Sequence, residues 1–181
     1  MESIAQKEIF FFIGIILWVM ASLKWGHWKS FKIYQASIFM MMTGDLVYGI
    51  LTTEQHSYWE YLSPGFGLNH TIIGIAITFV AFPCSILIYL SQYPSGLSWL
   101  RQLGYILMWV AIYTVLEWVT HTLKLMKYDN GWTLYWSIIL NCIAFSLLKL
   151  NQHKPLVASF LFIGFALFFS IYFEIPIMKL K

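Results

Sequence analysis

The sequence predicts an all-α integral membrane bundle of about six transmembrane helices, and two observations carry this prediction. Hydrophobic residues make up 60% of the 181 positions and charged residues 10%, whereas soluble domains average about 45–50% and about 25%. The apolar residues also occur in separated blocks, close in length to the roughly 17–25 residues that a helix needs to cross hydrocarbon. A transmembrane β-barrel would instead show short segments of alternating hydrophobicity.

Six apolar blocks, joined by polar segments, form one predicted transmembrane domain over residues 1–181. They cover residues 9–23, 33–51, 71–91, 103–123, 132–148 and 156–178. The first block has the length of a signal peptide. However, Glu2 and Glu8 offset Lys7 before it and lysines follow it closely, which favours a retained helix.

The third block and the connection before it have special features. Pro83 lies inside the block, where proline bends a helix or loosens its hydrogen-bond ladder. Small residues spaced four apart in this block permit close approach of neighbouring helices. The connection over residues 52–70 is rich in aromatic residues and contains no Lys or Arg, so we expect it to lie in the membrane interface.

The basic residues give only a weak indication of orientation. With six helices, both termini lie on one side of the membrane, together with five basic residues against six on the other side. The connection after the first block concentrates Lys24, Lys29 and Lys32. Because positively charged early connections usually remain in the cytoplasm, this pattern favours both termini outside.

Three acidic residues lie within the predicted spans, each near the C-terminal end of an even-numbered block. Asp45 and Glu117 lie about 9 Å inside those ends and Glu174 about 6 Å inside, at about 1.5 Å per residue. All three therefore fall in one leaflet. A lone charge near the bilayer centre costs about 2.5–3.5 kcal/mol on insertion scales, so these acids should face the bundle, meet donors or carry protons.

The fourth block suggests a partner for Glu117. Tyr113, Glu117 and His121 are spaced four residues apart and therefore share one helix face. We expect Glu117 and His121 to offset each other's burial, with Tyr113 as a donor and other polar groups across the helices. The candidate binding residues are Asp45, His70, Tyr113, Glu117, His121, Trp132 and Trp136.

The cluster is compatible with several functions. The leading prediction is a non-enzymatic protein whose cluster binds a small amphiphile or a membrane protein partner, or orders the bundle. The first alternative is a membrane-embedded enzyme acting on a lipid or isoprenoid, in which Glu117 is the general acid or base, His121 tunes it, and Asp45 or Glu174 stabilises positive charge. The second is a small proton-linked transporter, which needs access from both leaflets.

Other classes of function lack their sequence signals. There is no HExxH motif, phosphate-binding loop or dinucleotide glycine fingerprint, so we predict no metal and no cofactor. Cys84 and Cys142 lie inside apolar blocks, where cysteine acts as a small hydrophobic residue. The basic residues are spread among block ends, so the predicted partner is the lipid bilayer and not a nucleic acid.

Four short stretches carry a resemblance to a family. They are "LEW", "KYDNGWTLYWS", "HKP" and "FEIPIMK", within residues 116–179. In these stretches the chain resembles an uncharacterised family of small polytopic membrane proteins from endospore-forming Firmicutes, with residues 131–137 as the most specific part. The resemblance implies a multi-pass protein of a bacterial cytoplasmic membrane with about six helices. It implies no activity.

Overall fold

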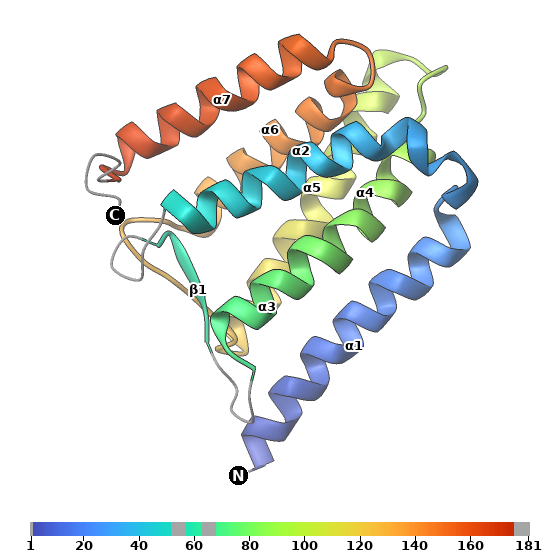
Figure 1. Cartoon of the computed structure of the whole chain (residues 1–181). Helices are drawn as coiled ribbons and strands as arrows, with labels where there is room; N and C mark the ends of the chain where they lie inside the picture. The colour runs from blue at the N-terminus through green and yellow to red at the C-terminus, as the bar shows by residue number, and fades with distance from the viewer. Residues whose placement is uncertain (1, 52–56, 63–67, 176–181) are drawn as a thin grey trace.

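The computed structural model describes residues 2–51, 57–62 and 68–175, and it is almost entirely helical (Figure 1). The helices are α1 (Glu2–Trp25), α2 (Phe31–Leu51), α3 (His70–Ala76), α4 (Phe82–Ser91), α5 (Trp99–Thr122), α6 (Leu134–Asn151) and α7 (Pro155–Tyr172), with a short 3₁₀ turn, η1 (Trp28–Ser30), and a π-helical segment, η2 (Ile77–Ala81). Two three-residue strands, β1 (Trp59–Tyr61) and β2 (Met126–Tyr128), pair antiparallel.

The predicted all-α membrane bundle is confirmed. Five helices in the described part of the chain are long and apolar enough to cross a membrane; they cover residues 8–25, 70–91, 99–122, 134–151 and 155–172. The described part of α2, which contains Gln35 and Asp45, is not among them. The outer faces of these helices are apolar, as in α7, where Phe160 is 75% exposed.

The helix over residues 70–91 contains the break expected at Pro83. Proline has no N–H and clashes with the carbonyl four residues earlier. The structure accommodates this with η2, after which the N–H of Phe82 donates to the carbonyl of Ile77, five residues back. The loosened hydrogen-bond ladder is therefore confirmed, and α4 packs against both α1 and α2.

The last helix ends earlier than the sequence analysis expected, and this corrects the prediction for Glu174. α7 ends at Tyr172, and Glu174 follows it in an exposed position with a positive φ of 52°. The N–H of Ile175 closes the turn on the carbonyl of Ser170 at 2.9 Å. The proline at position 176 disfavours helical backbone at the residue before it. Glu174 is therefore not part of a membrane-spanning helix, and the predicted residues 176–178 lie outside the described part of the chain.

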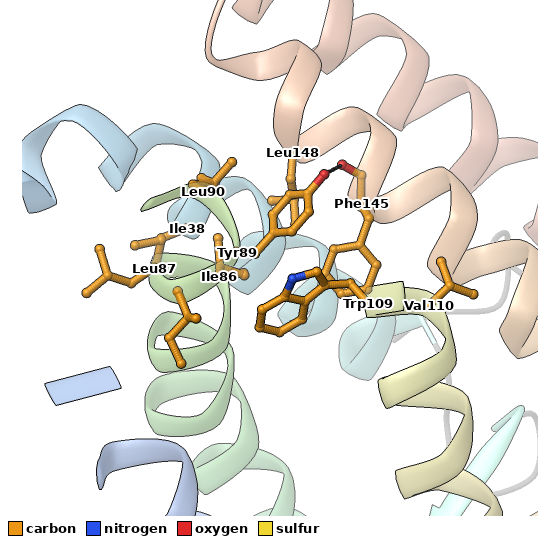
Figure 2. Packing of buried hydrophobic residues seen from close by; sticks show 10 residues of the cluster. Ile38, Ile86, Leu87, Tyr89, Leu90, Trp109, Val110, Phe145 and Leu148 are labelled. Atoms are coloured by element: carbon orange, nitrogen blue, oxygen red, sulfur yellow. Dashed lines mark hydrogen bonds between the residues drawn. The ribbon is translucent and has the colours of Figure 1, made fainter. Parts of the chain in front are cut away.

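A buried aromatic core joins the middle of the bundle. Tyr89 of α4 is fully buried, and its hydroxyl donates to the carbonyl of Phe145 in α6 at 2.8 Å (Figure 2). The Tyr89 ring lies edge-on to Trp109 of α5 at 5.7 Å. A buried tyrosine usually has a partner for its hydroxyl, so this bond joins α4 to α6, while the ring contact with Trp109 joins α4 to α5.

The helices alternate in direction, so that their connections gather at two ends (Figure 1). At one end β1 pairs with β2, bringing the connection before α3 against the connection after α5. At the opposite end the Gln92 side chain donates to the carbonyl of Trp25, and Lys149 donates to Ser95. We call the first the acidic end, because Asp45, Glu60, Glu117 and Asp129 lie there. We call the second the basic end, because its connections carry Lys24, Lys29, Lys32, Arg101, Lys149 and Lys154.

This arrangement predicts the accessibility of introduced cysteines. In a background in which Cys84 and Cys142 are replaced by serine, Thr71→Cys and Asp129→Cys should react from one side of the membrane, because both lie at the acidic end. Trp28→Cys and His153→Cys should react from the other side. The measurement is labelling of intact and permeabilised cells with an impermeant maleimide. If a cysteine of one pair is labelled from the same side of the membrane as the other pair, the arrangement is wrong.

Candidate functional site

The two strands cover the acidic end and bring charges together across the pair. Glu60 lies directly opposite Lys127, and their side chains form an ion pair at 2.8 Å. This hydrogen bond and the charge of Glu60 raise the pKa of Lys127. Because side chains alternate along a strand, Tyr61, Met126 and Tyr128 lie on the other face of the pair, and Met126 is only 6% exposed.

A tight turn carries the chain from β2 into α6. Asn130 and Gly131 have positive φ values of 49° and 79°, a conformation that suits asparagine and glycine. The Asn130 side chain donates to the carbonyl of Ser57 at 2.8 Å, and the N–H of Asp129 donates to the carbonyl of Tyr58 at 2.9 Å. These bonds fix Trp132, which is 3% exposed, beneath the strands.

Glu117 is held by a chain of hydrogen bonds that runs through this turn. The Tyr128 hydroxyl donates to Glu117 Oε1 at 2.8 Å, and the Ser137 hydroxyl donates to the same oxygen. The indole N–H of Trp132 donates to Ser137 Oγ at 2.8 Å. The carboxyl of α5 is thus connected to β2, to the turn and to the first turn of α6.

The Tyr128 hydroxyl keeps the proton that it donates to Glu117. Its burial and then its hydrogen bond to Glu117 and the charge of that carboxyl raise the pKa of its hydroxyl. The phenol therefore keeps its proton at neutral pH. The exposed ring of His121 stacks on Tyr128, with centroids 4.7 Å apart and planes 17° from parallel, so His121 covers the phenol from the outside.

Asp45 meets a hydroxyl from the π-helical segment. The Thr78 hydroxyl donates to Asp45 Oδ2 and also contacts the carbonyl of Gly74 at 2.9 Å. Thr78 is 1% exposed. The loosened helix around Pro83 therefore contributes the donor for the second carboxyl.

Tyr61 lies within electrostatic range of both carboxyls. Burial, then Asp45, then Glu117 raise the pKa of its hydroxyl. Its backbone N–H donates to Nδ1 of His70 at 3.0 Å, and the two rings stack at 5.6 Å. Tyr61 therefore contacts His70 and lies within electrostatic range of Asp45 and Glu117.

Neither carboxyl forms an ion pair in the described part of the chain, although His70 lies within electrostatic range of Asp45 and His121 within that of Glu117. The ion pairs found there join Lys127 to Glu60 and, at 3.9 Å, to Asp129. The described residues also contain no group of three or more His, Cys, Asp and Glu side chains that could hold a metal ion. Hydroxyl groups are therefore the donors that the structure gives to Asp45 and Glu117.

Three predicted site residues take other roles. The Tyr113 hydroxyl lies 2.6 Å from Ser85 Oγ, and its ring packs edge-on to Phe145 in the core. Trp136 packs edge-on to Phe173 at 5.3 Å, in an aromatic cluster around Trp132. Glu174 is exposed beyond α7. The donor expected from Tyr113 is replaced by Tyr128 and Ser137, whereas His121 of the same helix row lies within electrostatic range of Glu117.

Sequence reasoning missed four residues of the site: Tyr61, Thr78, Tyr128 and Ser137. Two of them had a signal. The words "WEY" and "MKY" each place one charge between apolar residues, an alternation that is typical of strands, and the two charges are opposite. Thr78 and Ser137 had none beyond being small hydroxyl residues inside apolar blocks.

Comparisons with known proteins gave no relative: no protein-family model matches the chain, and neither a curated protein nor a solved structure matches it significantly.

Proposed function

We propose that this chain is a multi-pass protein of a bacterial cytoplasmic membrane that binds a small amphiphile without catalysing a reaction. The headgroup of the amphiphile lies against Asp45 and Glu117, beneath the β1–β2 pair. Tyr61 and His70 border the headgroup, and His121 and Trp132 act through Tyr128 and Ser137. The bilayer is the source of the ligand.

One observation carries this proposal: among the described residues the two carboxyls accept hydrogen bonds from hydroxyl groups and form no ion pair. A carboxylate offers about four acceptor positions, and an unpaired charge at membrane depth is costly. The hydroxyl donors occupy some of these acceptor positions. A headgroup that carries positive charge and donates hydrogen bonds can occupy the remaining positions.

The surroundings of the carboxyls favour a ligand with an alkyl chain. On α5, Val115 and Trp118 beside Glu117 are each 56% exposed. On α2, Leu46 and Val47 beside Asp45 are 44% and 39% exposed. Exposed apolar side chains on a membrane helix contact lipid tails. An alkyl chain next to them stays in hydrocarbon while its headgroup reaches the carboxyls.

The test compares two amphiphiles of equal chain length, dodecylamine and 1-dodecanol, added to the protein in nanodiscs. Dodecylamine should raise the unfolding temperature saturably and more than 1-dodecanol, because its ammonium group pairs with the carboxyls. The double variant Asp45→Asn/Glu117→Gln should lose this difference, whereas Glu174→Gln, which changes an exposed carboxyl, should keep it. Equal shifts by the two amphiphiles in the parent protein would contradict the proposal.

The enzyme and transporter alternatives give different results. A lipid that accumulates in cells lacking the gene, and that disappears only with protein containing Glu117, would indicate the enzyme. Proton flux into proteoliposomes that Glu117→Gln abolishes would indicate the transporter. The binding protein predicts neither.

A further inference from the structure

The basic end concentrates positive charge without acidic residues. It is formed by the segments 24–32, 92–101 and 149–154 and holds six of the eleven basic residues. None of the eight Asp and Glu residues of the sequence falls in these segments. The six basic residues are Lys24, Lys29, Lys32, Arg101, Lys149 and Lys154.

The fold brings these three segments together. The N–H of His27 donates to Ser91 Oγ at 3.0 Å, and the Gln92 side chain donates to the carbonyl of Trp25 at 2.8 Å. Lys149 Nζ donates to Ser95 Oγ at 2.9 Å. Figure 1 shows the connections α1–α2, α4–α5 and α6–α7 at the same end of the bundle.

Neutral groups, not carboxylates, contact the basic side chains at this end. Lys24 lies over the ring of Trp25 at 4.8 Å, and Lys149 lies over the ring of Tyr93 at 4.4 Å. The ion pairs in the described part of the chain both involve Lys127, at the acidic end. The positive charge of the basic end is therefore not compensated by the protein.

Exposed tryptophans give the level of the lipid headgroups. Trp25, Trp28 and Trp99 lie in the same segments as the basic residues and are 50%, 44% and 70% exposed. Indole rings prefer the membrane–water interface, and lysine side chains near helix ends extend to the headgroups. The exposed Lys29, Lys32, Arg101 and Lys154 therefore lie at the level of the phosphates.

We propose that the basic end binds the phosphate groups of anionic phospholipids and lies on the cytoplasmic side of the membrane. The anionic cytoplasmic leaflet attracts each nearby Lys or Arg, and positive charge keeps short connections inside. The acidic end, with Asp45 and Glu117, then lies on the outer side. This inference uses the opposite end of the molecule and does not depend on the amphiphile site.

The test measures which phospholipids remain with the protein after purification from equal amounts of phosphatidylglycerol and phosphatidylcholine, by mass spectrometry. The parent protein should be enriched in phosphatidylglycerol. Lys29→Gln/Lys32→Gln/Lys154→Gln should lower the enrichment at least about tenfold, because each basic residue contributes about fivefold. The control Lys124→Gln/Lys127→Gln removes two lysines from the acidic end and should keep it. Unchanged enrichment in the triple variant, or equal loss in the control, overturns the proposal.

Two further measurements do not depend on whether the triple variant folds. In the parent protein, raising NaCl from 0.1 to 1 M shortens the Debye length from about 10 to about 3 Å and should lower the enrichment; an enrichment that ignores salt overturns phosphate binding. In cells, His153→Cys should label only after permeabilisation. Labelling of this cysteine from outside overturns the orientation.

Discussion

Replacing Glu117 by leucine should lower the stability of the protein by about 1–3 kcal/mol, whereas glutamine should change it little. Leucine removes the acceptor of two hydroxyls, those of Tyr128 and Ser137. A buried donor that loses its partner costs about 1–3 kcal/mol in water-soluble proteins, and interhelical bonds in membranes average about 0.6 kcal/mol. Glutamine keeps a carbonyl oxygen for both donors.

The measurement is thermal unfolding in nanodiscs, followed by tryptophan fluorescence. Glu117→Leu should unfold several degrees below the parent protein, and Glu117→Gln close to it. Glu174→Leu is the matched control, because that carboxylate is exposed beyond α7, and it should leave the unfolding temperature unchanged. If leucine and glutamine at position 117 unfold alike, Glu117 does not bear the hydrogen bonds described above.

The stability and ligand tests separate two roles of Glu117. Glutamine preserves the hydrogen bonds but removes the charge, so Glu117→Gln should fold normally and still weaken the binding of dodecylamine. A residue that only orders the bundle would tolerate glutamine in both measurements. The loss of binding without loss of stability is therefore the result that assigns the carboxyl to a ligand.

The helices could be predicted from the sequence because each span depends on its own residues. Block length and hydropathy determine whether a segment crosses a membrane, and the local effect of Pro83 on its helix was equally predictable. The end of α7 was missed by several residues because the apolar run continues past Tyr172, although the chain turns at Glu174.

The partners of Glu117 could not be predicted in the same way. A helix row relates residues four apart, but the donors are 11 and 20 residues away along the chain. Tyr128 reaches the carboxyl only because β2 pairs with β1, and Ser137 only because the Asn130–Gly131 turn returns the chain to the bundle. The opposite charges of Glu60 and Lys127 are compatible with a strand pair, which the sequence analysis did not predict, and they carry no information about what lies beneath it.

Replacing Trp132 by alanine should have the largest effect of any single substitution considered, about 3–5 kcal/mol, the usual cost of emptying a large buried aromatic position. The Trp132 ring is 3% exposed, stacks on Tyr58 at 4.6 Å and contacts Phe173 at 5.2 Å. Alanine would leave a cavity where the strands, the turn and α7 meet. The unfolding temperature of Trp132→Ala in nanodiscs should be about ten degrees or more below that of the parent protein.

Two other variants distinguish the roles of the ring and of its N–H group. Trp132→Phe keeps an aromatic ring but removes the bond to Ser137 Oγ, so it should cost about 0.5–1.5 kcal/mol. Trp118→Ala is the control, because Trp118 is 56% exposed on α5 and should be replaceable with little change.

The hydrogen bond also predicts that Trp132 and Glu117 are coupled through Ser137. If Ser137 relays the bond between them, Trp132→Phe should cost less in the Glu117→Leu protein than in the parent, because the hydroxyl of Ser137 has already lost its acceptor and is free to reorient. Residues in one hydrogen-bond network commonly couple by about 0.5–3 kcal/mol. Additive costs in a double-mutant cycle would contradict the chain of hydrogen bonds that connects Trp132 to the carboxyl.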